Sequence, residues 1–207
     1  MRAIEVDGSL VFRFSDDWDA LPWEDTKERR EQHADHRKAV DVAATGPSAL
    51  LVEVKDDRIK DVAAKGRRKK AVQKGAFLGA MSLKFRHSAE DILAIAVQPG
   101  RSPFYEVFAV RWQEQLRLLV LWWELPPEPP SGEGTRDDRW KAHLSSLQNK
   151  LKQDLHKHNL IARLRIANQR FCPHVVHGMD VADVAAGIAG RRESLRSRSS
   201  KSPKAPT

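Results

Sequence analysis

The sequence predicts an α/β domain in which helices flank a central mixed β-sheet. Two observations indicate this class. Runs rich in aliphatic, β-branched and aromatic residues, such as 50–54 and 116–125, have the composition of buried strands. Segments 61–85 and 139–158 instead repeat their apolar residues at spacings of three and four, as amphipathic helices do. The expected order is strands, helix, strand pair, helix, strands, helix and strand, all around one sheet.

The N-terminal part begins with a predicted β-hairpin, "AIEVDGSLVFRF", over residues 3–14. Asp7-Gly8 is a strong signal for the tight turn between its two strands. Polar, helix-forming residues follow from about 22 to 33. The stretch 41–55, "DVAATGPSALLVEVK", then predicts two strands joined by a Gly-Pro turn.

A helix is predicted next, over residues 61–85. Its expected inward positions are Val72, Ala76, Ala80 and Leu83. The following segment, "SAEDILAIAVQPG" over 88–100, has the pattern of a separate short helix that is N-capped by Ser88.

The C-terminal half contains two predicted core strands, 105–112 and 116–125, because both are strongly apolar. The clearest helix spans 139–158, and 160–168 is expected to be the last strand. The apolar stripe of that helix comprises Trp140, Leu144, Leu147, Leu151 and Leu155.

The charge of the chain is unevenly distributed. The net charge is +8, and residues 58–87 hold ten Lys or Arg against a single acid, Asp61. We expect one folded domain over 1–185 and a basic, disordered tail over 186–207, because the tail has almost no apolar side chains to bury. The basic segments predict an anionic partner such as nucleic acid.

Several classes of protein are disfavoured. No apolar run is long enough to span a bilayer, so no membrane association is expected. The first residues lack the basic, apolar and small-residue order of a secretory signal. Cys172 is the only cysteine, which rules out an internal disulfide and favours the reducing cytoplasm as the location.

The strand pair within 41–55 carries charge where a buried hairpin should be apolar. A turn centred on Pro47 places Asp41 opposite Glu53, and Lys55 then shares their face because side chains alternate along a strand. The opposite face collects a predicted core of Val40, Val42, Leu50, Val52 and Val54.

Two carboxylates held this close repel each other unless a cation lies between them. Mg²⁺ or Mn²⁺ suits such a pair, so Asp41 and Glu53 are candidate metal ligands. Lys55 is a candidate catalytic residue, since a lysine beside a metal and a phosphate can orient water or neutralise developing charge. The alternative is an ordinary half-exposed hairpin with a cross-strand charge cluster.

The segments "AVDVAAT" and "LLVEVKD" resemble the core of the PD-(D/E)XK, or restriction-endonuclease-like, nuclease superfamily. Asp41, Glu53 and Lys55 match its three defining positions, although Val40 stands where many members have proline. The resemblance covers roughly residues 20–125. It implies a central mixed sheet with helices on both sides and Mg²⁺-dependent phosphodiester cleavage. It also implies a further acid from the preceding helix, for which Glu24 or Asp25 is favoured.

The function expected from these features is a Mg²⁺-dependent endonuclease that acts on nucleic acid, with DNA favoured, in defence or repair. The alternative is a non-catalytic subunit that binds nucleic acid or a protein partner and keeps the nuclease fold. A protein partner that supplies targeting and a homodimer are both compatible with the sequence. The candidate phosphate-binding residues are Lys38, Arg58, Arg67, Arg68, Lys69, Lys70, Gln73 and Lys74.

Overall fold

The computed structural model describes residues 1–32, 37–60, 62–124, 126, 128–129, 134–170 and 174–184. Its strands are β1 (Arg2–Val6), β2 (Leu10–Phe14), β3 (Asp19–Leu21), β4 (Val42–Thr45), β5 (Ala49–Asp56), β6 (Arg117–Glu124), β7 (Arg163–Ala167) and β8 (Met179–Asp183). Its helices are α1 (Lys27–Gln32), α2 (Val62–Gln73), α3 (Ala76–Ala96), α4 (Pro103–Gln113) and α5 (Arg136–Lys157), with short 3-10 helices η1 (Trp23–Asp25) and η2 (Asp57–Ile59). The predicted tail, 186–207, lies outside the described residues.

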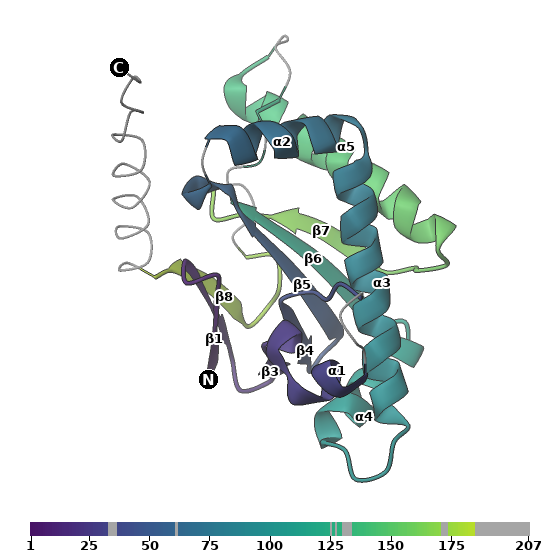
Figure 1. Cartoon of the computed structure of the whole chain (residues 1–207). Coiled ribbons are helices and arrows are strands. Elements are labelled where there is room, and N and C mark those ends of the chain that lie inside the picture. The colour runs from purple at the N-terminus through teal and green to yellow at the C-terminus, as the bar shows by residue number, and fades with distance from the viewer. Residues whose placement is uncertain are drawn as a thin grey trace, which may run out of the picture.

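The larger sheet has five strands in the order β3-β4-β5-β6-β7. β4 runs antiparallel to both β3 and β5, whereas β5, β6 and β7 are parallel to one another. Helices α2, α3 and α4 connect β5 to β6, and α5 connects β6 to β7 (Figure 1). The predicted mixed sheet and α/β class are therefore confirmed.

The predicted N-terminal hairpin forms, but it belongs to a second sheet of order β1-β2-β8. Asp7 and Gly8 both have positive φ angles, 54° and 61°, as the tight hairpin turn requires. The prediction of a single sheet was wrong. The prediction that 160–168 is the last strand was also wrong, because β8 follows it and extends the hairpin.

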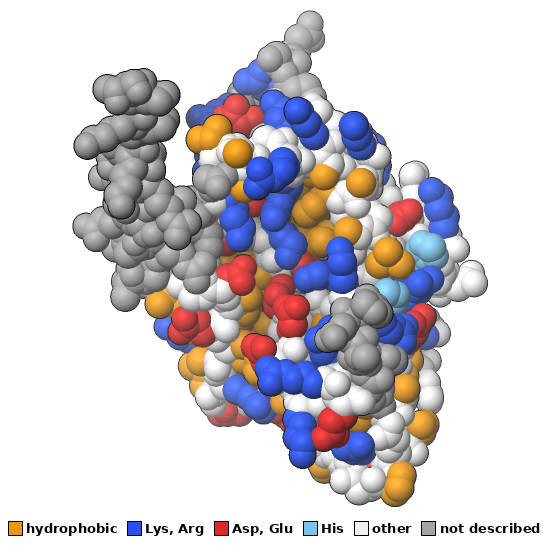
Figure 2. Space-filling model, viewed as in Figure 1, with side chains coloured by type: hydrophobic (Ala, Val, Ile, Leu, Met, Phe, Trp, Pro, Cys, Tyr) orange, Lys and Arg blue, Asp and Glu red, His pale blue; other side chains and the backbone are white. Residues whose placement is uncertain are grey.

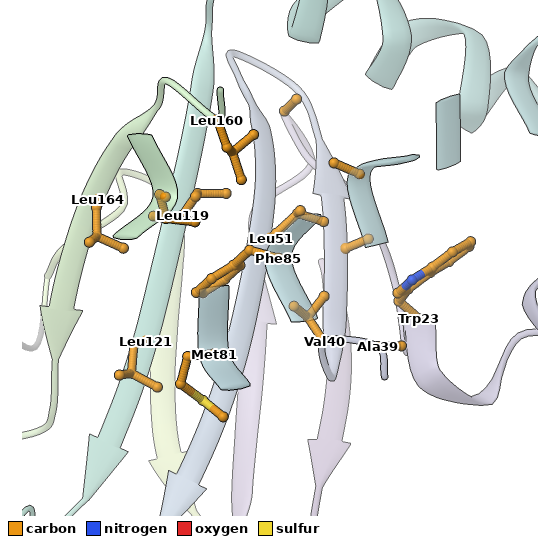
Figure 3. Close-up of a cluster of buried hydrophobic side chains, with 14 of the residues drawn as sticks. Trp23, Ala39, Val40, Leu51, Met81, Phe85, Leu119, Leu121, Leu160 and Leu164 are labelled. Carbon is orange, nitrogen blue, oxygen red and sulfur yellow. The ribbon is translucent and has the colours of Figure 1, made fainter. Parts of the chain in front are cut away.

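The two faces of the five-stranded sheet are covered differently. One face packs against α3, α4 and α5, and Figure 3 shows strand side chains such as Leu51 and Leu119 lying beside Phe85 of α3. The other face packs against the three-stranded sheet, with the rings of Phe12 and Trp122 edge to face at 5.7 Å. Helices on both sides were expected. Within the described part of the chain, the small sheet takes the place of the second helical layer.

The predicted helix over 61–85 is two helices, separated at Gly75, whose φ of 76° ends α2. α3 then runs through residue 88, so the separate helix predicted there was wrong. Ser88 is buried within α3, and its Oγ accepts a hydrogen bond from the Val40 N–H at 2.9 Å.

The predicted inward face of this segment was only partly right. Val72 and Ala80 pack at the margin of the core, but Ala76 and Leu83 are exposed. The apolar residues that α3 buries are Phe77, Leu78, Met81, Phe85, Ala89, Ile92 and Ile95. The buried face of α3 therefore lies at a different position around the helix axis from the predicted inward face.

The strand predicted over 105–112 is wrong, because these residues form α4. Ser102 caps the helix by accepting a hydrogen bond from the Phe104 N–H, and Pro103 occupies the first turn. The buried residues of α4 recur at helical rather than alternating spacing; they are Phe104, Tyr105, Phe108 and Trp112.

α5 confirms the clearest helix prediction, and its buried residues are the five predicted from the sequence. Thr135 caps it by accepting a hydrogen bond from the Asp138 N–H at 3.2 Å. None of the helices in the described ranges is both long and apolar enough to cross a bilayer.

Candidate active site

The position of Asp41 follows from the register of β4 against β5. Val42 pairs with Val52, so Asp41 precedes β4 by one residue and lies across from Glu53, as predicted. Because β4 starts only at Val42, which pairs with Val52, the Val54 N–H lies beyond the end of the β4–β5 pairing. Oδ2 of Asp41 accepts a hydrogen bond from this N–H at 2.6 Å. The carboxylate is thereby held beside β5 at the end of the hairpin.

One residue of the predicted opposite face lies elsewhere. Val40 was expected to join Val42 and Val52, but it packs with Ala39 and Leu51 on the helix-covered side (Figure 3). The chain bends at Asp41, so strand alternation does not extend back through it.

Glu53 is a fully buried acid on the helix-covered face of β5, with an exposed fraction of 0%. Two ammonium groups contact its carboxylate. Lys55 forms an ion pair with Oε1, and its Nζ also donates to the Val54 carbonyl at 2.8 Å. Lys84 of α3 donates to Oε1 and Oε2 at 2.8 and 3.0 Å. The structure thus brings Asp41, Glu53 and Lys55 together and adds Lys84.

The electrostatics of the site are coupled. Burial raises the pKa of Glu53 from its ordinary value of 4.5 to about 7; Lys55 and Lys84 oppose this shift, and the charge of Asp41 adds to it. Burial disfavours the ammonium form of Lys84, but attraction to Glu53 outweighs it and raises the pKa of Lys84. A buried acid that shares its site with another carboxylate and two lysines has the character of a functional centre.

Lys84 was missed by the sequence analysis because the inward stripe of α3 was placed wrongly. Lys84 follows Met81 by three residues and precedes Ser88 by four, so it lies on the same side of α3 as both. The side chains on this side are buried, including Met81, Phe85 and Ser88. A lysine inside a buried helical stripe needs an anionic partner. Once the buried face of α3 is known, Lys84 becomes a candidate partner of Glu53.

The two acids favoured before the Asp41 strand behave differently. Burial raises the pKa of Glu24, while Lys84 opposes this shift and Asp41 adds to it, so the Glu24 carboxyl lies within electrostatic reach of the site. Both residues are exposed, but Asp25 pairs with Arg30 at 3.3 Å instead of facing the site. Trp23, which is fully buried, anchors the 3-10 helix η1 that carries both acids.

Three basic residues of α2 are exposed, namely Arg67, Lys69 and Lys70, and α2 has no buried residue. Figure 2 shows acidic side chains near the middle of one face of the molecule, with Lys and Arg side chains above them on the side of α2. The exposed candidates for phosphate binding are Lys38, Arg67, Lys69, Lys70, Gln73 and Lys74. Gln73 and Lys74 line a cavity of about 360 Å³ together with Lys150 and Asp154 of α5. Gln73 and Lys74 therefore lie beside α5.

Two other predicted phosphate-binding residues are held within the fold. Arg58 pairs with Asp56 and with Asp183, each at 2.8 Å, and its side chain is 17% exposed. Arg68 pairs with Asp57 at 3.0 Å and lies over the Phe77 ring. These contacts give both arginines a role in packing, whatever else they bind.

Asp41 and Glu53 are the residues of the site that could hold a divalent cation. Among the residues that the structure describes, no group of three or more His, Cys, Asp or Glu side chains is arranged to hold a metal ion. Mg²⁺, however, is commonly bound by one or two carboxylates together with waters and substrate phosphates, and not by an all-protein cage. Asp41 and Glu53 offer two hard oxygen ligands on neighbouring segments, and this donor set fits Mg²⁺ or Mn²⁺.

Comparisons of this chain with models of protein families, with curated proteins and with solved structures give no match.

Proposed function

We propose that this chain is a nuclease that uses Mg²⁺ or Mn²⁺ to hydrolyse phosphodiester bonds in nucleic acid, with DNA as the favoured substrate. The observation that carries the proposal is the convergence of Asp41, Glu53 and Lys55 at the end of the β4–β5 hairpin. An Asp followed after a hairpin by Glu-x-Lys on the next strand is the pattern behind the resemblance to the PD-(D/E)XK superfamily. The five-stranded mixed sheet supports the same assignment.

Each residue of the site has a role in this reaction. Asp41 and Glu53 would hold the divalent ion, which when bound supplies a Lewis acid for the phosphate and lowers the pKa of a water. Hydrolysis forms a bond from the water oxygen to phosphorus and breaks the bond to the leaving sugar oxygen. Lys55 places a positive charge where the phosphoryl oxygens gain negative charge. Glu24, whose pKa is raised, can accept the proton that the water loses.

The substrate class follows from the charge around the site. Phosphate contacts from Lys and Arg provide most of the affinity in non-specific binding to nucleic acid. The exposed residues Arg67, Lys69 and Lys70 offer such contacts on α2. α2 begins six residues after Asp56, the last residue of β5, so the basic helix follows the Glu53 strand closely in the chain.

A cleavage assay tests this function. The full chain is incubated with supercoiled, linear and single-stranded DNA, and with RNA, in Mg²⁺, in Mn²⁺ and in a chelator. Cleavage by the wild type should require the cation. Asp41→Asn, Glu53→Gln and Lys55→Met should each lower the rate by about 10²-fold or more, the usual cost of losing such a group. Lys152→Met, an exposed lysine on α5, is the matched control and should leave the rate unchanged.

The same assay addresses the alternative function. A non-catalytic binding subunit would retain affinity for nucleic acid but show no turnover with either cation. Binding without cleavage by the wild type, on all four substrates, would overturn the nuclease proposal.

A further inference from the structure

The Lys84 ammonium group donates to both carboxylate oxygens of Glu53, which are the atoms that would coordinate a divalent cation. We propose that Lys84 is a built-in counter-cation that competes with the divalent ion, so that the ion binds Glu53 only as the Lys84 ammonium leaves it. This inference deepens the proposed function and rests on it, because it describes how cation binding at the same site is controlled.

The Glu53 carboxylate already has an ammonium group on both of its oxygens. The Nζ of Lys84 donates to both carboxylate oxygens of Glu53, at 2.8 and 3.0 Å. Glu53 is fully buried, so few other positions around these oxygens are open to a cation. An ion that coordinates Glu53 must therefore displace an ammonium group.

Charge balance also favours departure of Lys84. The charges that act on Glu53 are those of Asp41, Lys55 and Lys84. With Glu53 and these three groups ionised, their sum is zero, and a divalent ion would raise it to +2. Without the Lys84 charge, the same ion would leave only +1. Partly buried sites favour neutrality, because isolated charge is costly away from water.

Of the two lysines at Glu53, Lys84 is the one that leaves, because Lys55 is held more firmly. Lys55 has a second anchor, the Val54 carbonyl at 2.8 Å, on its own strand. Within the described ranges, hydrogen bonds and ion pairs of Lys84 go to Glu53 alone. The side chains of Lys84 and Lys55 are similarly exposed, at 14% and 18%, so the second anchor of Lys55 is what distinguishes them.

Mn²⁺ binding measured by calorimetry on the full chain tests the competition without any cleavage. Lys84→Met should bind Mn²⁺ at least about tenfold more tightly than the wild type, since it removes like-charge repulsion in a partly buried site. Lys84→Gln, which keeps a hydrogen-bond donor but no charge, should bind Mn²⁺ as tightly as Lys84→Met. Lys84→Arg keeps the charge, and Lys152→Met removes a distant one; both should stay close to the wild-type affinity.

Thermal denaturation provides a second measurement. Without Mn²⁺, Lys84→Met should melt below the wild type, because Glu53 loses a counter-ion, and saturating Mn²⁺ should raise its melting temperature more than it raises that of the wild type. If Lys84→Met and Lys84→Gln are unfolded without the ion, recovery of folding by Mn²⁺ supports the inference, and failure to recover overturns it.

The outcomes separate this inference from the nuclease proposal. Equal or weaker Mn²⁺ binding by Lys84→Met overturns the competition, even if the wild type cleaves DNA. Tighter binding supports the competition, and if the wild type then fails to cleave any substrate, the nuclease proposal alone is overturned.

Discussion

Arg58 joins the two sheets, because its Nη2 lies 2.8 Å from Oδ1 of Asp183 on β8 and 2.8 Å from Oδ2 of Asp56 at the end of β5. The Asp56 side chain is fully buried. Burial disfavours its anion, but hydrogen bonds from Arg58 hold the pKa of Asp56 below its ordinary value. Arg58 is therefore the partner that keeps a buried carboxylate paired.

The first prediction concerns this contact. Arg58→Met should lower the free energy of unfolding by about 3–5 kcal/mol, the usual cost of leaving one member of a buried pair alone. Asp183→Asn should cost less, because the Asp183 side chain is 40% exposed. Urea denaturation of both variants measures the difference. Arg67→Met, which alters an exposed arginine, is the control; a stable Arg58→Met variant would contradict the structural role.

The second prediction concerns the exposed residues of α2. Replacing Arg67, Lys69 and Lys70 with Ala should weaken DNA binding, and each lost phosphate contact should reduce the slope of log K against log salt by about 0.7–0.9. Fluorescence anisotropy across a salt titration measures the slope. Lys152→Ala controls for the loss of charge alone. An unchanged slope in the α2 variants would show that this surface is only solvated.

The third prediction compares neighbouring acids. Glu24→Gln should slow Mg²⁺-dependent cleavage by about tenfold or more, in the range of general acid–base effects. Asp25→Asn should leave cleavage unchanged, because Asp25 pairs with Arg30 on the surface. Initial rates at saturating DNA measure both variants. Equal effects of the two substitutions would remove Glu24 from the site.

Much of the site could be predicted from the sequence because a hairpin is local. The Gly-Pro turn and strand alternation are enough to set Asp41 across from Glu53 and to place Lys55 on the same face. The contact of Lys84 with Glu53 could not be predicted from a local pattern in the sequence. It depends on the rotation of α3, which is set by packing against the sheet and not by the helix alone.

The parts of the fold that were missed have a common cause. Residues 105–112 are rich in aromatic and β-branched residues, so composition favoured a strand, while the buried spacing of Phe104, Phe108 and Trp112 is helical. The pairing of β8 with β2 and the contact of Arg58 with Asp183 join residues far apart in the chain. The number of basic residues in a sequence does not show which of them form ion pairs with carboxylates in the folded protein.

The last prediction follows from Glu53, whose pKa rises from 4.5 to about 7 on folding, chiefly through burial. A carboxyl with a raised pKa binds its proton more tightly in the folded state than in the unfolded state. Its contribution to stability is therefore complete below the unfolded pKa and is lost as the pH rises from 4.5 to about 7. The slope should reach at most about 1.4 kcal/mol per pH unit for this one group.

Urea denaturation of the wild type and of Glu53→Gln at several pH values isolates this contribution, since the variant keeps the other titrating groups. The difference in unfolding free energy between the two proteins should change across the interval from 4.5 to about 7 and level off on either side. Divalent cations should lower the pKa of Glu53, because they bind the ionised carboxylate and release its proton. Stabilisation of the protein by Mg²⁺ should therefore grow as the pH rises. A difference that stays constant with pH would mean that folding does not raise the pKa of Glu53, with Lys55 and Lys84 offsetting its burial.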